Sequence, residues 1–234
     1  MTLDMHIKPT NGLDVTPADS STYKGVRTFL LGRMGGRNST GYQTIMNSGF
    51  NIEKATGSSL AFVIAATEPL QEENIATLSL EDAIKIIAHD QAEGTNHFEG
   101  IYSDIKEAIL YTNDKSQLST NLADIAKNQE NISYDAENPA RFIGLGIDKD
   151  NKQGYKFVET EKTKVITDPR FSHKNNEQKV EFSGTNIKVF TKSIGSAGLF
   201  ANEYGLDAWC GYSAYSDVDG RVGLVHAEGV DSKN

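Results

Sequence analysis

The sequence predicts an α+β fold, with mixed or antiparallel β-sheets in a sandwich-like arrangement and a helical middle section. Two observations lead to this expectation. Apolar residues recur at helical spacing between residues 79 and 128, and from residue 141 to residue 226 the apolar spacing shortens to the period of two that is typical of strands. The 234 residues fit one large domain. We therefore expect a loosely ordered segment over 1–23 and a single catalytic domain over 24–234.

Two strands are expected before the helical section. The first covers residues 24–33, and the second covers 59–66, which contains the longest apolar run of the chain, Leu60–Ala66. A short apolar run bounded by polar residues is typical of a buried strand. We expect both strands to join the sheets of the C-terminal half.

Three helices are expected in the middle section. The first begins at Ser79, because Ser79 and Asp82 have the spacing of a capping box, with Asp in place of the usual Glu or Gln. The third runs from about residue 116 to 128. The apolar stripes of the three helices are Leu80, Ala83, Ile84, Ile87 and Ala88, then Phe98, Ile101, Ile105, Ala108 and Ile109, then Leu118, Leu122 and Ile125.

The C-terminal half is expected to be made of strands. Alternating apolar residues predict strands over 141–147 and 155–167, with a turn at 148–154, and a hairpin that joins 178–182 to 186–190. A last hairpin is expected between 207–216 and 222–226, with Val218-Asp219-Gly220 as its turn.

Charge and composition narrow the possible partners. The net charge of −9 argues against binding to nucleic acid or to an anionic membrane. No apolar run is long enough to span a membrane, and the N-terminus lacks the pattern of a secretory signal peptide. A single cysteine excludes an internal disulfide and a cysteine-based metal site, and the histidines lack a metal-binding spacing. We expect no metal.

The last predicted hairpin holds Cys210, the only cysteine, and His226. A three-residue turn closed by Gly220 in the left-handed region would pair Tyr212 with His226. Cys210 would then lie diagonal to His226 on the same face, within about 7–8 Å between Cβ atoms. A histidine at this distance can activate a thiol as a nucleophile, so the pair is a candidate catalytic site. A free cysteine that only packs in the core is the alternative interpretation.

The segment Cys210-Gly-Tyr-Ser-Ala-Tyr-Ser-Asp217, a turn and Gly223-Leu-Val-His226 resemble the core motif of the cysteine-dependent glutamine deamidases. This family includes the bacterial chemotaxis receptor deamidases and the catalytic domains of the cytotoxic necrotizing factor toxins. The resemblance covers about 20 residues, and Trp209 stands where the family has Gly or Ser. The orienting or oxyanion candidates are Gly211, Thr191, Tyr204 and Val189.

The resemblance implies hydrolysis of a protein glutamine carboxamide through a Cys210 thiolate, with His226 as the proton carrier and no cofactor. Transglutamination would use the same site. It also implies a protein substrate, such as a host regulatory protein, and a toxin or effector that is secreted without a classical signal peptide and acts in the host cytosol. A cytoplasmic location is the alternative, and the oligomeric state is left open.

Two other functions stay open. An ADP-ribosyltransferase-type toxin would use NAD, with Arg27 on an early strand, a strand over 213–216, and a late Glu228. A non-enzymatic binding or structural protein would bury Cys210 as an inert thiol.

Overall fold

The fold comes from a computed structural model that describes residues 16–129, 132–148, 155–209, 211 and 213–226. Residues 1–15 of the expected N-terminal segment lie outside this part of the chain, and from Thr16 onwards the chain belongs to the fold. The helices are α1 (Ser20–Arg33), α2 (Thr40–Met46), α3 (Leu60–Gln71), α4 (Leu80–Glu93) and α5 (Gln117–Lys127), with short 3₁₀ helices η1 (Pro169–Phe171) and η2 (His173–Asn175).

The strands form three sheets. They are β1 (Thr16–Pro17), β2 (Ile75–Thr77), β3 (Tyr102–Leu110), β4 (Ala140–Ile143), β5 (Gly146–Asp148), β6 (Lys156–Val158), β7 (Lys164–Thr167), β8 (Lys179–Phe182), β9 (Thr185–Phe190), β10 (Ser196–Asn202), β11 (Gly205–Asp207) and β12 (Gly223–His226).

The largest sheet has seven strands in the order β7-β4-β3-β10-β11-β9-β8. Its neighbouring strands run antiparallel, except for the parallel pair β11 and β9. The strands β1, β12 and β2 form a second sheet, and β5 pairs with β6. Helices and mixed sheets in one chain confirm the predicted α+β class.

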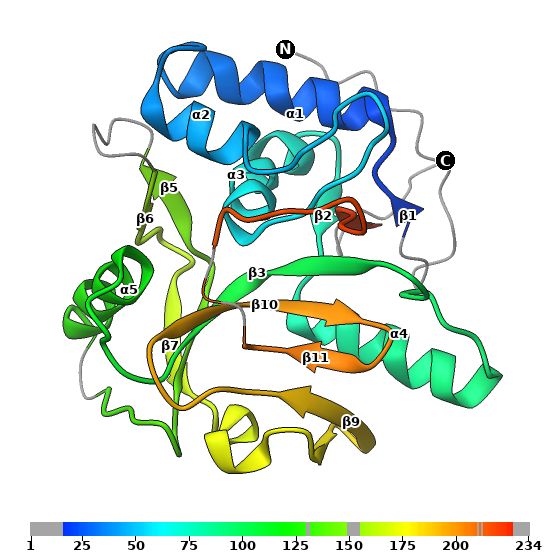
Figure 1. The fold of residues 1–234 in the computed structure, drawn as a ribbon, viewed down its shortest axis with the longest axis vertical. Coiled ribbons are helices and arrows are strands. Elements are labelled where there is room, and N and C mark those ends of the chain that lie inside the picture. The colour runs from blue at the N-terminus through cyan, green and yellow to red at the C-terminus, as the bar shows by residue number, and fades with distance from the viewer. Residues whose placement is uncertain (1–15, 130–131, 149–154, 210, 212, 227–234) are drawn as a thin grey trace.

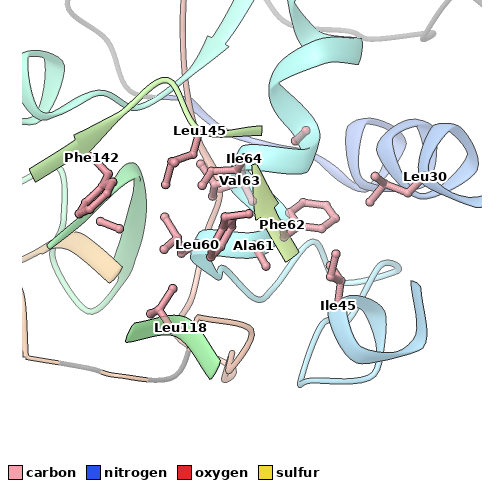
Figure 2. Packing of buried hydrophobic residues seen from close by; sticks show 14 of the residues in the cluster. Leu30, Ile45, Leu60, Ala61, Phe62, Val63, Ile64, Leu118, Phe142 and Leu145 are labelled. Carbon is pink, nitrogen blue, oxygen red and sulfur yellow. The ribbon is translucent and has the colours of Figure 1, made fainter. Parts of the chain in front are cut away.

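Helix α3 occupies the middle of the molecule. Figure 1 shows α1 and α2 on one side of α3 and the large sheet on the other, while α4 packs against β3 and β9. Two apolar clusters result. In the first, Leu60, Phe62 and Ile64 of α3 lie among apolar side chains of α1, α2, α5 and the β4–β5 region (Figure 2). The second lies between α4 and the strands β3, β9, β10 and β11.

The two strands predicted near the N-terminus are wrong, because both segments are helices. In α1, Tyr23, Val26 and Leu30 are buried at helical spacing, and the Asp19 carboxylate accepts the first-turn N–H of Thr22 at 2.8 Å. The apolar run from Leu60 begins α3, where the Ser59 hydroxyl accepts the N–H of Phe62. The first five residues of α3, 60–64, are all buried, and a helical segment without a polar side looks like a buried strand in its sequence.

The first and third predicted helices are confirmed as α4 and α5. Ser79 and Asp82 form the capping box of α4, and Gly94 ends this helix with φ of 68°. The second predicted helix is wrong, because residues 102–110 form β3. This strand lies between the two apolar clusters, so Ile105 and Ile109 face one cluster and Ala108 faces the other. Apolar residues on both faces of a strand produce the same spacing as a helical stripe.

The C-terminal strands are confirmed in part. The hairpin of β8 and β9 has the expected register around Ser183 and Gly184, both with positive φ. The predicted strand 141–147 divides into β4 and β5 at Gly144, where φ is 71°, and 155–167 divides into β6 and β7. The predicted turn at 148–154 falls, apart from Asp148, outside the described residues.

Candidate functional site

The last predicted hairpin is wrong. Its second arm is β12, which lies between β1 and β2: Leu224 pairs with Thr16 on one side and with Thr77 on the other. At Leu224 both edges of β12 are therefore occupied. The described part of 208–222 consists of turns and irregular backbone in place of the expected first arm.

The two expected arms lead to opposite ends of α3. The Ser213 carbonyl accepts the N–H of Ala61 at 2.8 Å, at the N-terminal end of the helix. His226 pairs with Ile75, which follows the C-terminal end of the helix. A helix of 12 residues is about 18 Å long. Cys210 itself lies outside the described residues, so its contact with His226 stays a prediction.

The segment that carries Cys210 borders a cavity of about 650 Å³. This volume is within the usual range for small-molecule sites. Gly211 lines it, as do all four residues from Ser213 to Ser216. The rest of the wall comes from the start of α5, from Tyr155 and Phe157 near β6, and from the turn after α2; the residues are Ser116, Gln117, Leu118, Asn121, Ser48 and Gly49.

Hydrogen bonds hold this segment in place. The Ser216 hydroxyl accepts the N–H of Ser58 at 2.7 Å, and the Ser216 N–H donates to the Ser48 carbonyl at 2.9 Å. The Ser213 hydroxyl is hydrogen-bonded to the Tyr155 phenol. The segment is therefore fixed by contacts with parts of the chain far away in sequence, and this is why it does not fold back on β12.

A lysine lies beside Gly211, the residue that follows Cys210. A Cβ atom placed on Gly211 would be 3.1 Å from the Lys192 Nζ. The Lys192 Nζ donates to the Ser196 carbonyl at 2.8 Å. A lysine ammonium beside a cysteine favours the thiolate over the thiol.

The start of α5 adds to the positive potential. Ser116 is the N-cap of α5, and its hydroxyl accepts the N–H of Ser119. The N–H groups of Gln117 and Leu118 have no acceptor within the helix, since the first turn of a helix lacks one. The N-terminus of α5, with its partial positive charge, therefore borders the cavity, and the Ser116 N–H at this end donates to the Asp114 carboxylate at 3.0 Å.

Asp114 is an acidic residue close to the N-terminus of α5 and to Lys192. Hydrogen bonds from Ser116 and Ser119 lower the pKa of Asp114 to about 2, and the charge of Lys192 contributes further. The Ser119 and Ser196 hydroxyls lie 2.9 Å apart. Ser119 therefore links Asp114 to Ser196, whose carbonyl accepts the hydrogen bond from Lys192. Asp114 therefore stays ionised at neutral pH and balances the Lys192 charge.

A buried carboxyl group lies next to the start of α3. Asp104 is 7% exposed, its N–H donates to the Ser58 hydroxyl at 3.0 Å, and its Oδ2 has no hydrogen-bond partner within the described chain. Burial raises the pKa of Asp104 to about 7; hydrogen bonding to Ser58 opposes this shift and the charge of Asp217 adds to it. Asp104 does not line the cavity.

The other predicted site residues lie elsewhere. The Thr191 hydroxyl is buried and donates to the Ser172 carbonyl at 3.1 Å. Tyr204 is 66% exposed in the turn between β10 and β11, beside a different and smaller cavity. Val189 is buried in β9 and contributes to the second apolar cluster. The three do not line the cavity beside Gly211, and their orienting role stays a prediction.

The residues considered for an ADP-ribosyltransferase are not arranged as that function requires. Arg27 lies on α1, and its Nε donates to the Tyr42 phenol at 2.9 Å. Residues 213–216 form no strand, and Glu228 lies outside the described residues. The strand positions that this alternative assigned to Arg27 and to 213–216 are therefore wrong.

The sequence analysis missed Lys192, Ser116, Asn121 and Tyr155. Only the N-cap of α5 had a local signal, because Ser116 begins the predicted third helix. The other three reach the cavity through the tertiary fold. Asn121, for example, makes two hydrogen bonds with the backbone of Phe157.

Within the described ranges, we found no group of three or more metal-ligating side chains and no helix long and apolar enough to cross a membrane. Comparison of the chain with protein-family models, curated proteins and solved structures gave no match.

Proposed function

We propose that the protein is a cysteine-dependent hydrolase that deamidates a glutamine side chain of a partner protein, with Cys210 as its nucleophile. The observation that carries this proposal is the cavity beside Gly211. The described residues that follow Cys210 and the N-terminus of α5 line it, and the Lys192 Nζ lies beside the lining residue Gly211. The resemblance of residues 210–226 to the glutamine deamidases supplies the reaction.

The electrostatic surroundings support a reactive thiol. A cysteine close to a lysine and to a helix N-terminus has a lowered thiol pKa, and the thiolate is the nucleophilic form. In the proposed site this role belongs to Lys192 and α5. We assign it to these groups rather than to His226, whose backbone pairs with Ile75 beyond the other end of α3.

The proposed reaction consumes one water and releases one ammonia. The Cys210 thiolate attacks the carboxamide carbon, and the oxygen of the tetrahedral intermediate takes up the negative charge. The free N–H groups at the start of α5 are candidate donors to this oxygen. The amide nitrogen takes a proton from water and leaves as ammonia, and a second water then hydrolyses the thioester. Glutamate is released, the Cys210 thiolate is restored, and one water is consumed overall.

The first test measures the reactivity of Cys210. Iodoacetamide should alkylate the folded protein at slightly acid pH at least about tenfold faster than the unfolded protein, because more of the thiol is ionised. Lys192→Met should slow this reaction, while His226→Ala should leave it unchanged. Lys127→Met is the control, because Lys127 is an exposed lysine paired with Asp124 at 2.9 Å.

Slower alkylation of the folded than of the unfolded wild-type protein would show that Cys210 is a packing residue, and equal rates would show that its thiol is not activated. Either result would favour the non-enzymatic alternative. Slower alkylation of Cys210 in His226→Ala than in the wild type would show that His226 contributes to the activation of the thiol.

The second test concerns the substrate. Purified host regulatory proteins are incubated with the wild type and with Cys210→Ser, and intact mass and ammonia release are measured. We expect the mass change from glutamine to glutamate with the wild type only. The choice of host proteins, like secretion and action in the host cytosol, rests on the resemblance alone.

A further inference from the structure

The cavity beside Gly211 is bordered by exposed apolar side chains. Trp209 is 65% exposed, Tyr215 is 59% exposed and Val218 is 71% exposed, and we name these three residues the aromatic rim. Six large hydrophobic residues are exposed in the described part of the chain, and half of them fall within these ten positions. Such clustering is unlike the scattered exposure of single apolar residues that is normal on a surface.

In the chain, the aromatic rim residues lie within or directly beside the segment 211–216, whose described residues line the cavity. Tyr215 lines the cavity. Trp209 is two residues before Gly211, and Val218 is two residues after Ser216, so each Cα lies within about 7 Å of a lining residue. A ligand in the cavity therefore contacts Tyr215, and two further exposed apolar residues follow or precede the lining residues closely in the chain.

The charges near the aromatic rim are mostly negative. Between residues 207 and 221 the chain has Asp207, Asp217 and Asp219 against the single cation Arg221. The Arg221 guanidinium is engaged by two backbone carbonyls, those of Val218 and Gly220, each at 2.7 Å. The whole chain carries a net charge of −9. A partner with basic side chains is therefore favoured here.

We propose that the aromatic rim is the docking surface for a polypeptide segment of the substrate that carries an apolar side chain and a lysine or arginine next to the glutamine that enters the cavity. This proposal rests on the proposed function, since it names the substrate class of the same site. Tryptophan and tyrosine are the residues that most often dominate protein interfaces, because they bury a large area at a small cost in side-chain entropy.

A second copy of the chain fits this surface poorly. In a symmetric dimer the same patch meets itself, which would bring the aspartates of one copy against those of the other. An anionic membrane is disfavoured for the same reason of charge. A basic polypeptide has the complementary charge.

The test uses a phage-displayed library of random short peptides and the Cys210→Ser protein, which binds without turnover. We expect the selected peptides to be enriched in lysine or arginine next to leucine or an aromatic residue. Fluorescein-labelled copies of these peptides are then titrated by anisotropy. Trp209→Ala and Tyr215→Ala should each weaken binding at least about tenfold.

Tyr204→Ala is the matched control, because Tyr204 is 66% exposed and borders a different cavity. It should leave the dissociation constant unchanged. Replacement of the peptide's lysine by glutamate should weaken binding by about tenfold, in line with the charge of the surface. Equal binding by all variants, or no enrichment in the selection, would overturn the docking proposal. A dimer that dissociates in the rim variants would identify a second copy as the occupant and would overturn it as well.

The two proposals fail in different ways. Alkylation of Cys210 measures the nucleophile without a peptide, and anisotropy measures docking without a thiol. Peptide binding that depends on Trp209 in a protein with an inert Cys210 would retain the docking surface and reject the hydrolase. A reactive Cys210 in a protein that selects no peptides would retain the hydrolase and reject the docking surface.

Discussion

Replacement of Asp104 by asparagine should change how the stability of the protein depends on pH. Asp104 is buried next to the start of α3, and burial raises its pKa from 3.8 to about 7. The buried carboxyl is therefore more stable in its protonated form. Asparagine has nearly the same shape and does not titrate.

The size of the effect follows from the two pKa values. Between pH 3.8 and about 7, folded Asp104 retains its proton while unfolded Asp104 has released it. The contribution of Asp104 to stability is therefore complete below about pH 4 and declines by about 1.4 kcal/mol per pH unit as the pH rises. Over about three units the loss is about 4 kcal/mol, and it ends once the pH exceeds the folded pKa.

Urea denaturation of the wild type and of Asp104→Asn at several pH values between 4 and 8 measures this effect. From pH 4 to pH 8 the free energy of unfolding of the variant should rise by about 4 kcal/mol relative to that of the wild type. The other titrating groups are the same in both proteins, so their contributions cancel in the difference. Asp217→Asn should keep most of the wild-type dependence, since burial is the larger cause of the raised pKa and the Asp217 charge a smaller one. Parallel curves for the wild type and Asp104→Asn would refute the reasoning.

Two further predictions concern the core and a turn. Glu107→Gln should lower the free energy of unfolding by about 3 kcal/mol in urea denaturation, because the buried Arg141 guanidinium loses a carboxylate 3.1 Å away; an unchanged denaturation midpoint would contradict this. Gly205→Ala should lower the melting temperature more than Gly184→Ala, because a Cβ at Gly205 would be 2.1 Å from the Lys188 carbonyl oxygen, whereas at Gly184 it would meet nothing within 4 Å. Equal shifts would contradict the close approach.

Helices with one polar face were predictable from the sequence. In α4 the capping box of Ser79 and Asp82 and the stripe that follows Leu80 agree with each other, and α5 likewise has one apolar face. Agreement between a local cap and the periodicity of the same segment made these two predictions reliable.

Segments buried on all sides were not predictable by periodicity. In α3 the five residues 60–64 are all buried and cover the whole circumference, so the run from Leu60 does not differ from a buried strand in its pattern. Strand β3 has apolar residues on both faces because each face meets one of the two clusters, and its spacing matches that of a helix. In both cases burial depends on what surrounds the element, and the local sequence does not contain that information.

The candidate site illustrates the same limit at larger scale. A hairpin turn at Val218–Gly220 is locally favourable, but it competes with the hydrogen bonds that Ser213 and Ser216 make to Ala61 and Ser58 at the start of α3. The second arm, β12, pairs with β2 along residues 224–226 and with β1 at Gly223 and Leu224, where a hairpin partner would otherwise lie. The tertiary contacts therefore override the turn. In place of the predicted hairpin, the segment borders a cavity, and the nearby cation is Lys192, which no local sequence pattern indicated. The local motif suggests that His226 activates the thiol, and the fold suggests that Lys192 does. Measuring the alkylation rate of Cys210 in His226→Ala and in Lys192→Met distinguishes the two.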